Sequence, residues 1–329
     1  MSVKSRAMRD AFLERIHGAM ATDEALFFVS ADFGSPVLDR IRADFGDRFV
    51  NVGVAEQNLI NVSAGLALEG YKVFAYAIAP FITMRCFEQI RVSLALLSQV
   101  RPMNVNLIGV GAGYSYVVSG PTHQCYEDLT IMRALPGVRI LSPSDHRLAA
   151  ALFDHCVDYV GPKYLRFDAQ VLPVAHMGAP DVAQGFRALR DGDAVCLLAT
   201  GFMTHTALAA ATKLAGEGIE VAVLDLFSIT HFDEIELKRV LDGYRGVVTL
   251  EEGFRARGGV DALLFDFLAR TGCATRMRNI GVDPGYRFEL GTRDELHEQV
   301  SIGVKAVVSQ VRDFVRRIED KHPKYSGTP

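Results

Sequence analysis

Residues 49–78 read FVNVGVAEQNLINVSAGLALEGYKVFAYAI and contain three segments of different periodicity. Phe49–Val54 and Tyr71–Ile78 are apolar runs of strand length, and Gln57–Glu69 between them carries its apolar residues at helical spacing. A strand, a helix and a second strand in this order predict a parallel pair with a crossover helix. Outward from this unit, we interpret the chain as an α/β protein.

The same alternation extends along the chain in both directions. Further strands are expected at Leu26–Ala31, Met103–Val110, Val138–Ser142, Tyr164–Phe167, Ala194–Thr200, Glu220–Phe227 and Val247–Leu250. Further helices are expected at Ala7–Ile16, Phe81–Leu97, His146–Tyr159, Thr204–Gly216, Asp233–Tyr244, Gly259–Thr271 and Gly303–Glu319. A segment rich in Pro, Gly, Ala and Asp interrupts the alternation, so a linker is predicted at about 171–190. The pattern predicts two tandem parallel-sheet α/β domains, residues 1–180 and 191–329.

Composition and charge exclude several classes of protein. The 329 residues suffice for two domains of ~150 residues, and a hydrophobic content of 49% favours a folded chain. A net charge of −4 without basic runs argues against a nucleic-acid partner. The longest apolar runs are shorter than the ~18 residues of a spanning helix, so no membrane association is expected. Five scattered cysteines without CxxC spacing indicate neither a disulfide framework nor a zinc site, and they make the cytoplasm the expected location.

Three polar residues follow apolar runs, at the strand ends where open parallel sheets bind ligands. Glu56 opens a helix whose next turns are almost uncharged, so it is either a proton donor of raised pKa or a carboxylate facing the helix dipole. His123 lies in a turn, either as a proton shuttle or as a solvent-facing histidine. Arg166 ends a strand, where it either clamps an anion or forms a structural ion pair.

Other features give weaker indications. The glycines of residues 109–113 lack the G-x-G-x-x-G spacing of a dinucleotide-binding loop. Glu251 and Glu252 follow an apolar run and are expected to be a solvated strand end. By helical spacing alone, Phe81 belongs to a core stripe.

Five strings, taken together and in order, resemble the thiamine-diphosphate enzymes of the transketolase family. They are Val54-Ala-Glu56-Gln, Gly70-Tyr-Lys72 leading to Phe81, Arg85-Cys-Phe-Glu-Gln-Ile-Arg91, Gly120-Pro-Thr-His-Gln124 and Leu141-Ser-Pro-Ser-Asp145. The resemblance covers essentially the whole chain. Residues 1 to about 180 are similar to the pyrimidine-binding domain, and the remainder is similar to the C-terminal domain of the family.

This resemblance implies an enzyme that transfers a two-carbon unit from a ketose-type donor to an aldehyde or keto-sugar acceptor. Glu56 would hydrogen-bond the pyrimidine ring of thiamine diphosphate, and Phe81 would stack on that ring. His123 would hydrogen-bond the substrate carbonyl or alkoxide. Ser119, Gln124 and Arg166 would complete the substrate site, with Arg166 holding an anionic end.

The resemblance also implies that half of the site lies on another chain. Family members hold the diphosphate and Mg²⁺ through a Gly-Asp-Gly motif and a later Asn, whereas this chain has no Gly-Asp-Gly triplet. Asp191-Gly-Asp193 has no Asn at the required distance. We therefore expect no metal ligand on this chain, a partner subunit that carries the diphosphate and Mg²⁺, and an α2β2 assembly.

Departures from the family pattern bear on the substrate. Ser119 stands where the family has an Asp that recognises a substrate hydroxyl, and Gly111-Ala112 stand where a His or Arg is usual. Gly113-Tyr-Ser-Tyr116 would then build a wall for a bulkier or non-phosphorylated acceptor, such as a nucleotide-linked sugar. The alternatives are the β subunit of a 2-oxo acid dehydrogenase, a decarboxylating acetyl transferase acting on a keto sugar, and a non-catalytic module. The Gly-Pro-Thr-His-Gln string favours the transketolase form.

Overall fold

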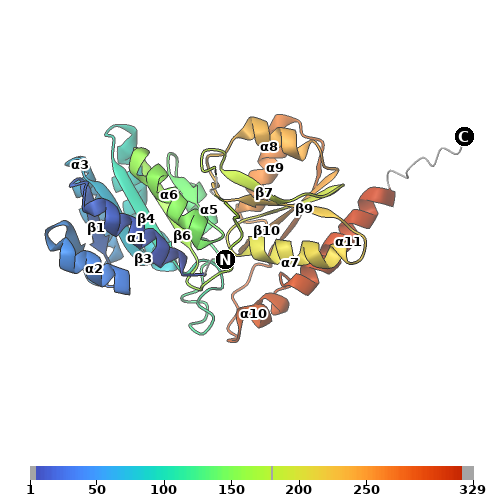
Figure 1. Cartoon of the computed structure of the whole chain (residues 1–329), viewed down its shortest axis with the longest axis horizontal. Helices are drawn as coiled ribbons and strands as arrows, with labels where there is room; N and C mark the ends of the chain where they lie inside the picture. Colours follow the sequence, from blue (N-terminus) through green and yellow to red (C-terminus); the bar gives the residue numbers. More distant parts are fainter. Residues whose placement is uncertain (1–4, 179–180, 321–329) are drawn as a thin grey trace, which may run out of the picture.

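The computed structural model describes residues 5–178 and 181–320 as two α/β domains side by side (Figure 1). The first domain is built on a six-stranded sheet with the order β2-β1-β3-β4-β6-β5, and every neighbouring pair in it is parallel. The second is built on a five-stranded sheet with the order β11-β10-β8-β9-β7. The predicted α/β class with two tandem domains is therefore confirmed.

The first domain follows the predicted alternation closely. Its strands are β1 (Leu26–Ser30), β2 (Phe49–Asn51), β3 (Lys72–Ile78), β4 (Asn104–Val110), β5 (Arg139–Leu141) and β6 (Pro162–Phe167). Its regular helices of six or more residues are α1 (Met8–Met20), α2 (Pro36–Asp44), α3 (Glu56–Leu68), α5 (Asp128–Arg133) and α6 (His146–Asp158). β4 is buried along its whole length because helices cover both faces of the sheet.

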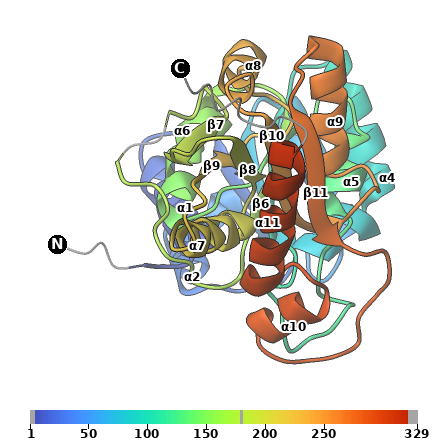
Figure 2. The ribbon, with the colours of Figure 1, turned by 90° about the vertical axis from the view of Figure 1, so that its right-hand side faces the viewer.

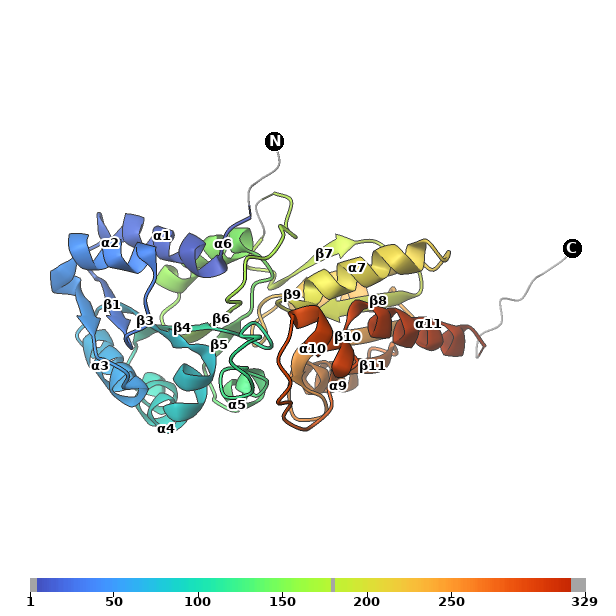
Figure 3. The ribbon, with the colours of Figure 1, turned by 90° about the horizontal axis from the view of Figure 1, so that it is seen from below.

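Two helical layers enclose this first sheet. Figure 3 shows α1, α2 and α6 on one side of the strands and α3, α4 (Phe87–Gln89) and α5 on the other. One hydrophobic core joins α1, α2 and α6 to the sheet, and a second core lies beneath α3 and the segment that follows β3. Because every strand pair of this sheet is parallel, the carboxyl ends of its strands lie at one edge, which we call the carboxyl edge.

The segment 81–99 differs from the single α-helix expected over Phe81–Leu97. It winds as a π-helix at Phe81–Arg85, as α4, as a second π-helix at Ile90–Leu96 and as a 3₁₀ turn at Leu97–Gln99. π-helical turns inside helices often occur at functional sites, because the wider turn realigns the side chains that follow.

The second domain has one feature that the parallel pattern does not predict. Its strands are β7 (Phe186–Arg190), β8 (Val195–Ala199), β9 (Val221–Leu226), β10 (Gly246–Phe254) and β11 (Arg276–Val282). β7 pairs antiparallel with β9 and falls within the expected linker range 171–190. The second sheet is therefore mixed, with an antiparallel edge strand on an otherwise parallel sheet.

Helices again cover both faces of the second sheet. They are α7 (Met203–Ala215), α8 (Glu234–Leu241), α9 (Val260–Thr271), α10 (Arg293–Gln299) and α11 (Val304–Asp320). Figure 2 shows α7 and α11 side by side, and their apolar residues share a core with the sheet. Of the helices in the described residues, none is long and apolar enough to cross a membrane. All five cysteines are buried and unpaired.

Candidate active site

Three of the predicted site residues meet at the carboxyl edge of the first sheet. Glu56 begins α3 after β2, Phe81 follows β3, and His123 lies in the loop after β4. We call residues 111–127 the His123 loop. Because β2, β1, β3 and β4 are consecutive in the sheet, these connections emerge next to one another.

Glu56 is a buried carboxylate with one charged partner. The residue is 3% exposed, and its Oε2 accepts a hydrogen bond from Arg85 Nη1 at 2.7 Å. The Arg85 side chain is 43% exposed, so it reaches the carboxylate from the solvent side. Among the described residues, no hydrogen-bond donor reaches Glu56 Oε1. The carboxylate therefore keeps one oxygen available for a ligand.

Phe81 connects this carboxylate to His123. The Arg85 guanidinium carbon lies 4.3 Å from the centre of the Phe81 ring. The His123 ring meets Phe81 edge-on, with 5.2 Å between ring centres, and Thr122 Oγ1 lies 3.0 Å from His123 Nδ1. In the part of the chain that the structure describes, His123 Nε2 has no hydrogen-bond partner. Glu56, Arg85, Phe81 and His123 form one continuous cluster, which we call the Glu56 group.

The glycines at the start of the His123 loop allow close packing. A Cβ on Gly111 would collide with the Tyr116 ring, and one on Gly113 would collide with the Glu252 carboxylate. Tyr116 in turn lies edge-on to His123 at 6.3 Å between ring centres. The close packing around Gly111 and Gly113 explains why this string is rich in glycine although it lacks the spacing of a dinucleotide-binding loop. Ser119 is exposed on the same loop.

Gln124 and Arg166 do not join the Glu56 group. Gln124 is 1% exposed, and its Oε1 accepts a hydrogen bond from the Tyr126 hydroxyl. Arg166 is 3% exposed, and its Nε donates to Asp128 Oδ2 at 2.7 Å. The structural ion pair that the sequence left open for Arg166 is present, so we do not carry its anion-holding role into the function proposed below.

One expectation about the second domain is wrong. Glu251 and Glu252 are not a solvated strand end, since they are 1% and 2% exposed. Glu251 accepts hydrogen bonds from the backbone N–H groups of Val260 and Asp261 at the start of α9, and burial raises its pKa to about 7. Glu252 accepts hydrogen bonds from Arg293 of α10 within the second domain and from the backbone N–H of Tyr114 in the first domain.

Sequence reasoning also missed Arg85 as a site residue, although it stands in one of the five family strings. Its position four residues after Phe81 was the available signal. Both residues lie in the π-helical turn Phe81–Arg85, where the guanidinium of Arg85 rests on the Phe81 ring. The contacts of Glu252 had no local signal, because its partners lie far away in the sequence.

The Glu56 group fits the pyrimidine end of thiamine diphosphate. A heteroaromatic ring needs an aromatic surface and a hydrogen-bonding group in its plane, which Phe81 and the free oxygen of Glu56 would supply. Arg85 now lies over Phe81 and would have to swing aside. Within residues 5–178 and 181–320, no cluster of three or more His, Cys, Asp or Glu side chains could hold a metal ion.

Tandem α/β domains that bring a buried carboxylate and an aromatic ring to one sheet edge suit a subunit that binds a heteroaromatic cofactor. Comparison with known families agrees with this class. Residues 4–174 match the transketolase pyrimidine-binding domain, and residues 185–307 match the transketolase C-terminal domain. The chain belongs to the transketolase family, as its sequence strings indicated.

Three relatives narrow the comparison. A subunit of the apulose-4-phosphate transketolase of Actinobacillus succinogenes is 32% identical over 80% of this chain and 84% of its own. The 6-deoxy-6-sulfo-D-fructose transketolase subunit SqwH of a Clostridium species is 30% identical over 94% and 95%. A solved structure described as a split gene transketolase, inactive beta4 tetramer, superposes with a TM-score of 0.81 at 28% identity, covering 94% and 98%.

These relatives are subunits of transketolases that are split between chains. The chain is a transferase subunit of this type. It and these three relatives are equivalent subunits of the split enzyme. The family depends on thiamine diphosphate, and one subunit of a split enzyme implies a partner subunit.

Proposed function

We propose that this chain is the pyrimidine-binding subunit of a split thiamine-diphosphate transketolase that transfers a two-carbon unit from a ketose-type donor to an aldehyde or keto-sugar acceptor. The Glu56 group carries the proposal, because it combines a buried carboxylate, an aromatic ring and a histidine whose Nε2 has no hydrogen-bond partner among the described residues. When bound, the cofactor supplies the nucleophilic carbon that accepts the two-carbon unit.

Each residue of the Glu56 group has a defined task. Glu56 shares a proton with the pyrimidine ring nitrogen through its free oxygen, and its burial strengthens that hydrogen bond. Phe81 supports the face of the ring. His123 Nε2 donates a hydrogen bond to the substrate oxygen, while Thr122 orients the imidazole through Nδ1. Without the cofactor, Arg85 donates a hydrogen bond to Glu56 and lies over the Phe81 ring, so its side chain would have to move when the cofactor binds.

The partner supplies the other half of the site. We assign the diphosphate and Mg²⁺ to a second subunit and the active assembly to an α2β2 heterotetramer. The missing Gly-Asp-Gly motif supports this division, as does the related tetramer of β chains, which is described as inactive. Five unpaired buried cysteines support a reducing location, the cytoplasm.

The substrate is a sugar without a defined phosphate requirement. The names of the two sequence relatives include a sugar phosphate and a sulfo sugar, so substrates differ between related subunits. Ser119, rather than an Asp, is exposed on the His123 loop, and Tyr116 lies beside His123. These residues support an acceptor that is bulkier than a pentose phosphate. We infer a sugar that bears a carbonyl group, such as a nucleotide-linked sugar. Efficient turnover of xylulose 5-phosphate with ribose 5-phosphate would contradict that part of the proposal.

Substitution of Glu56 tests the proposed mechanism in the complete assembly. Glu56→Gln keeps an oxygen for Arg85 but cannot share a carboxyl proton, so turnover should fall by about 10²–10⁴-fold with the fold retained. Glu69→Gln, an exposed carboxylate at the other end of α3, is the matched control and should leave turnover unchanged. A Glu56→Ala assembly that turns over at the wild-type rate would show that the proposal is wrong.

A further inference from the structure

A buried group of charges crosses from one domain to the other. Arg293, the first residue of α10, donates from Nη1 to Asp168 Oδ2 at 2.6 Å and from Nη2 to Glu252 Oε2 at 2.6 Å. His297 Nε2 lies 2.7 Å from Glu252 Oε1. These four residues, which we call the interdomain cluster, are each at most 5% exposed. Burial alone would raise the pKa of Glu252, but Arg293 and His297 hold it well below its usual range.

The interdomain cluster reaches the His123 loop through Glu252. Glu252 Oε1 accepts a hydrogen bond from the backbone N–H of Tyr114 at 3.3 Å. The adjacent Gly113, at φ +55°, leaves no room for a side chain between the loop and this carboxylate. A charged acceptor of the C-terminal domain therefore contacts the backbone of the loop directly.

The C-terminal domain packs against both sides of the loop stem, residues 113–114 and 125–126. Gly113 and Cys125 exchange two backbone hydrogen bonds of 3.0 Å, which close the loop that carries Ser119 and His123. On one strand the Tyr114 ring packs against His297 at 5.4 Å between ring centres. On the other, Tyr126 packs against Phe254 at 5.1 Å.

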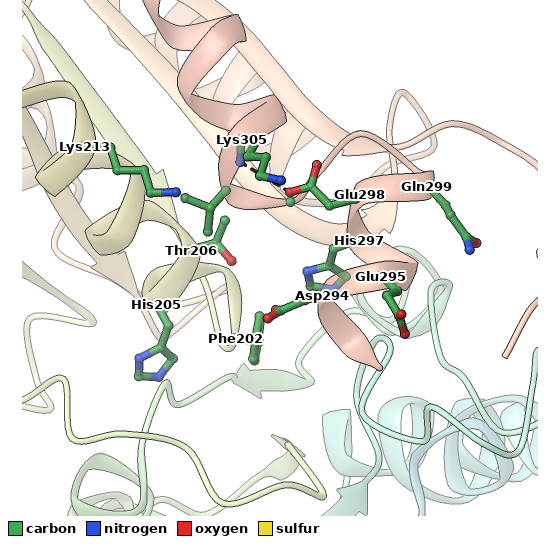
Figure 4. A pocket seen from close by; sticks show the side chains of 12 residues that line it. Phe202, His205, Thr206, Lys213, Asp294, Glu295, His297, Glu298, Gln299 and Lys305 are labelled. Carbon is green, nitrogen blue, oxygen red and sulfur yellow. Dashed lines mark hydrogen bonds between the residues drawn. The ribbon is translucent and has the colours of Figure 1, made fainter. Parts of the chain in front are cut away.

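A hollow lies behind the interdomain cluster. Phe202, which stacks on the Arg293 guanidinium at 3.6 Å, and His297 both line a cavity of about 690 Å³ between α7 and the α10–α11 corner (Figure 4). None of the residues that line the cavity belongs to the Glu56 group. The interdomain cluster thus lies between this cavity, which His297 lines, and the stem of the His123 loop, which Glu252 contacts.

We propose that Arg293 and Glu252 are positioning residues that fix the His123 loop, so that the C-terminal domain sets the place of His123 against the substrate. The inference rests on the proposed function for its kinetic consequence, but not for the loop anchoring itself. Arg293 and Glu252 affect the rate without touching the substrate, because a misplacement of the His123 side chain by ~1 Å can lower the rate about 10²-fold.

The experiment compares Arg293→Lys with a matched control, Arg133→Lys. Lysine keeps the charge but lacks the planar fork with which Arg293 donates from Nε and Nη2 to Glu252 and from Nη1 to Asp168. Arg133 also links the domains, from α5 to the carbonyls of Gly258 and Gly259, and within the described residues these are its side-chain hydrogen bonds. An effect that both variants share indicates a weakened contact between the two domains. An effect that only Arg293→Lys shows indicates that the His123 loop has lost its anchor.

Hydrogen exchange on the isolated chain is the first readout. Amides of residues 113–125 should exchange about tenfold or more faster in Arg293→Lys, as expected for loss of a charge-assisted contact, and at the wild-type rate in Arg133→Lys. Equal exchange of this segment in both variants would overturn the proposal. If Arg293→Lys does not fold, Glu252→Gln is measured in the same way, because it keeps an acceptor oxygen for Arg293 and for the Tyr114 N–H but removes the charge. The expected and contradicting results are the same.

Kinetics of the complete assembly is the second readout. Arg293→Lys should lower kcat by about 10–100-fold while the affinity for thiamine diphosphate stays within about twofold of wild type. A kcat equal to that of Arg133→Lys would overturn the catalytic role of the positioning. If the loop loosens as expected but the wild-type assembly transfers no two-carbon unit, the proposed function fails and the loop anchoring stands.

Discussion

Replacing Arg166 by methionine separates a structural arginine from a substrate anchor. Arg166 is 3% exposed, and its guanidinium donates to Asp128, whose Oδ2 also accepts from the Tyr164 hydroxyl at 2.8 Å. Methionine fills much of the same space without a charge. The substitution therefore leaves the Asp128 carboxylate buried and deprived of its cation.

The magnitude follows from what remains around Asp128. Removing one partner of a buried ion pair costs about 3–5 kcal/mol. Asp128 keeps two donors, the Tyr164 hydroxyl and the backbone N–H of Leu129 at 2.9 Å, which places the expected loss near the lower end, about 3 kcal/mol. The double variant Arg166→Met/Asp128→Asn should recover part of this loss, because no uncompensated charge remains.

Urea unfolding of the isolated chain, followed by circular dichroism, measures the effect. With a slope of ~3 kcal/mol per M for a chain of this size, the Arg166→Met midpoint should fall by about 1 M. Arg190→Met breaks an exposed pair with Glu220 and should cost less than about 1 kcal/mol. A loss below 1 kcal/mol for Arg166→Met, together with a large rise in substrate KM, would refute the structural role.

Three further predictions concern the pH response, the cofactor and the substrate. Burial, assisted by Arg139, lowers the pKa of His155 to about 4 from an ordinary value of 6.5. The folded chain therefore keeps His155 neutral while the unfolded chain protonates it, so this stability is present above pH 6.5 and is lost as the pH falls towards 4. Urea unfolding at pH 7 and pH 4.5 measures how much unfolding free energy is lost on acidification. With a discount for the half-burial of the residue, His155→Gln should reduce this loss by about 1–2 kcal/mol. An equal loss in the wild type and the variant would contradict this. Phe81→Ala should weaken thiamine-diphosphate binding by the assembly about 5–100-fold in calorimetry, whereas unaltered affinity would show that the ring does not support the cofactor. Ser119→Asp, on an exposed position, should raise kcat/KM for pentose phosphates without changing stability, and an unchanged or lower kcat/KM at unchanged stability would count against the assigned substrate contact.

The fold was largely predictable because its central strands are long apolar runs between amphipathic helices. β7 and β11 were missed, since Phe186-Arg-Ala-Leu-Arg190 and Arg276-Met-Arg-Asn-Ile-Gly-Val282 interleave charged and apolar residues at the edges of the second sheet. Edge strands are partly exposed, so they lack the continuous hydrophobic signal of β4.

The candidate site was predictable where a local string carries it and unpredictable where distant residues meet. Glu56, Phe81 and His123 each stand in a recognisable string, and the structure places them together. The Arg293 contact with Asp168 spans 125 residues, and its contact with Glu252 spans 41. No local periodicity records such pairs, and so the expectation of a solvated Glu252 was wrong.

Calorimetric titration of thiamine diphosphate with Mg²⁺ tests most directly whether the cofactor site is shared between two chains. The titration is made on this chain alone and on its mixture with a diphosphate-binding subunit. The shared site predicts tight binding only in the mixture, with loss of that binding when Glu56 and Phe81 are both replaced. Tight binding by the isolated chain, or tight binding in the mixture that survives the double replacement, would contradict the account.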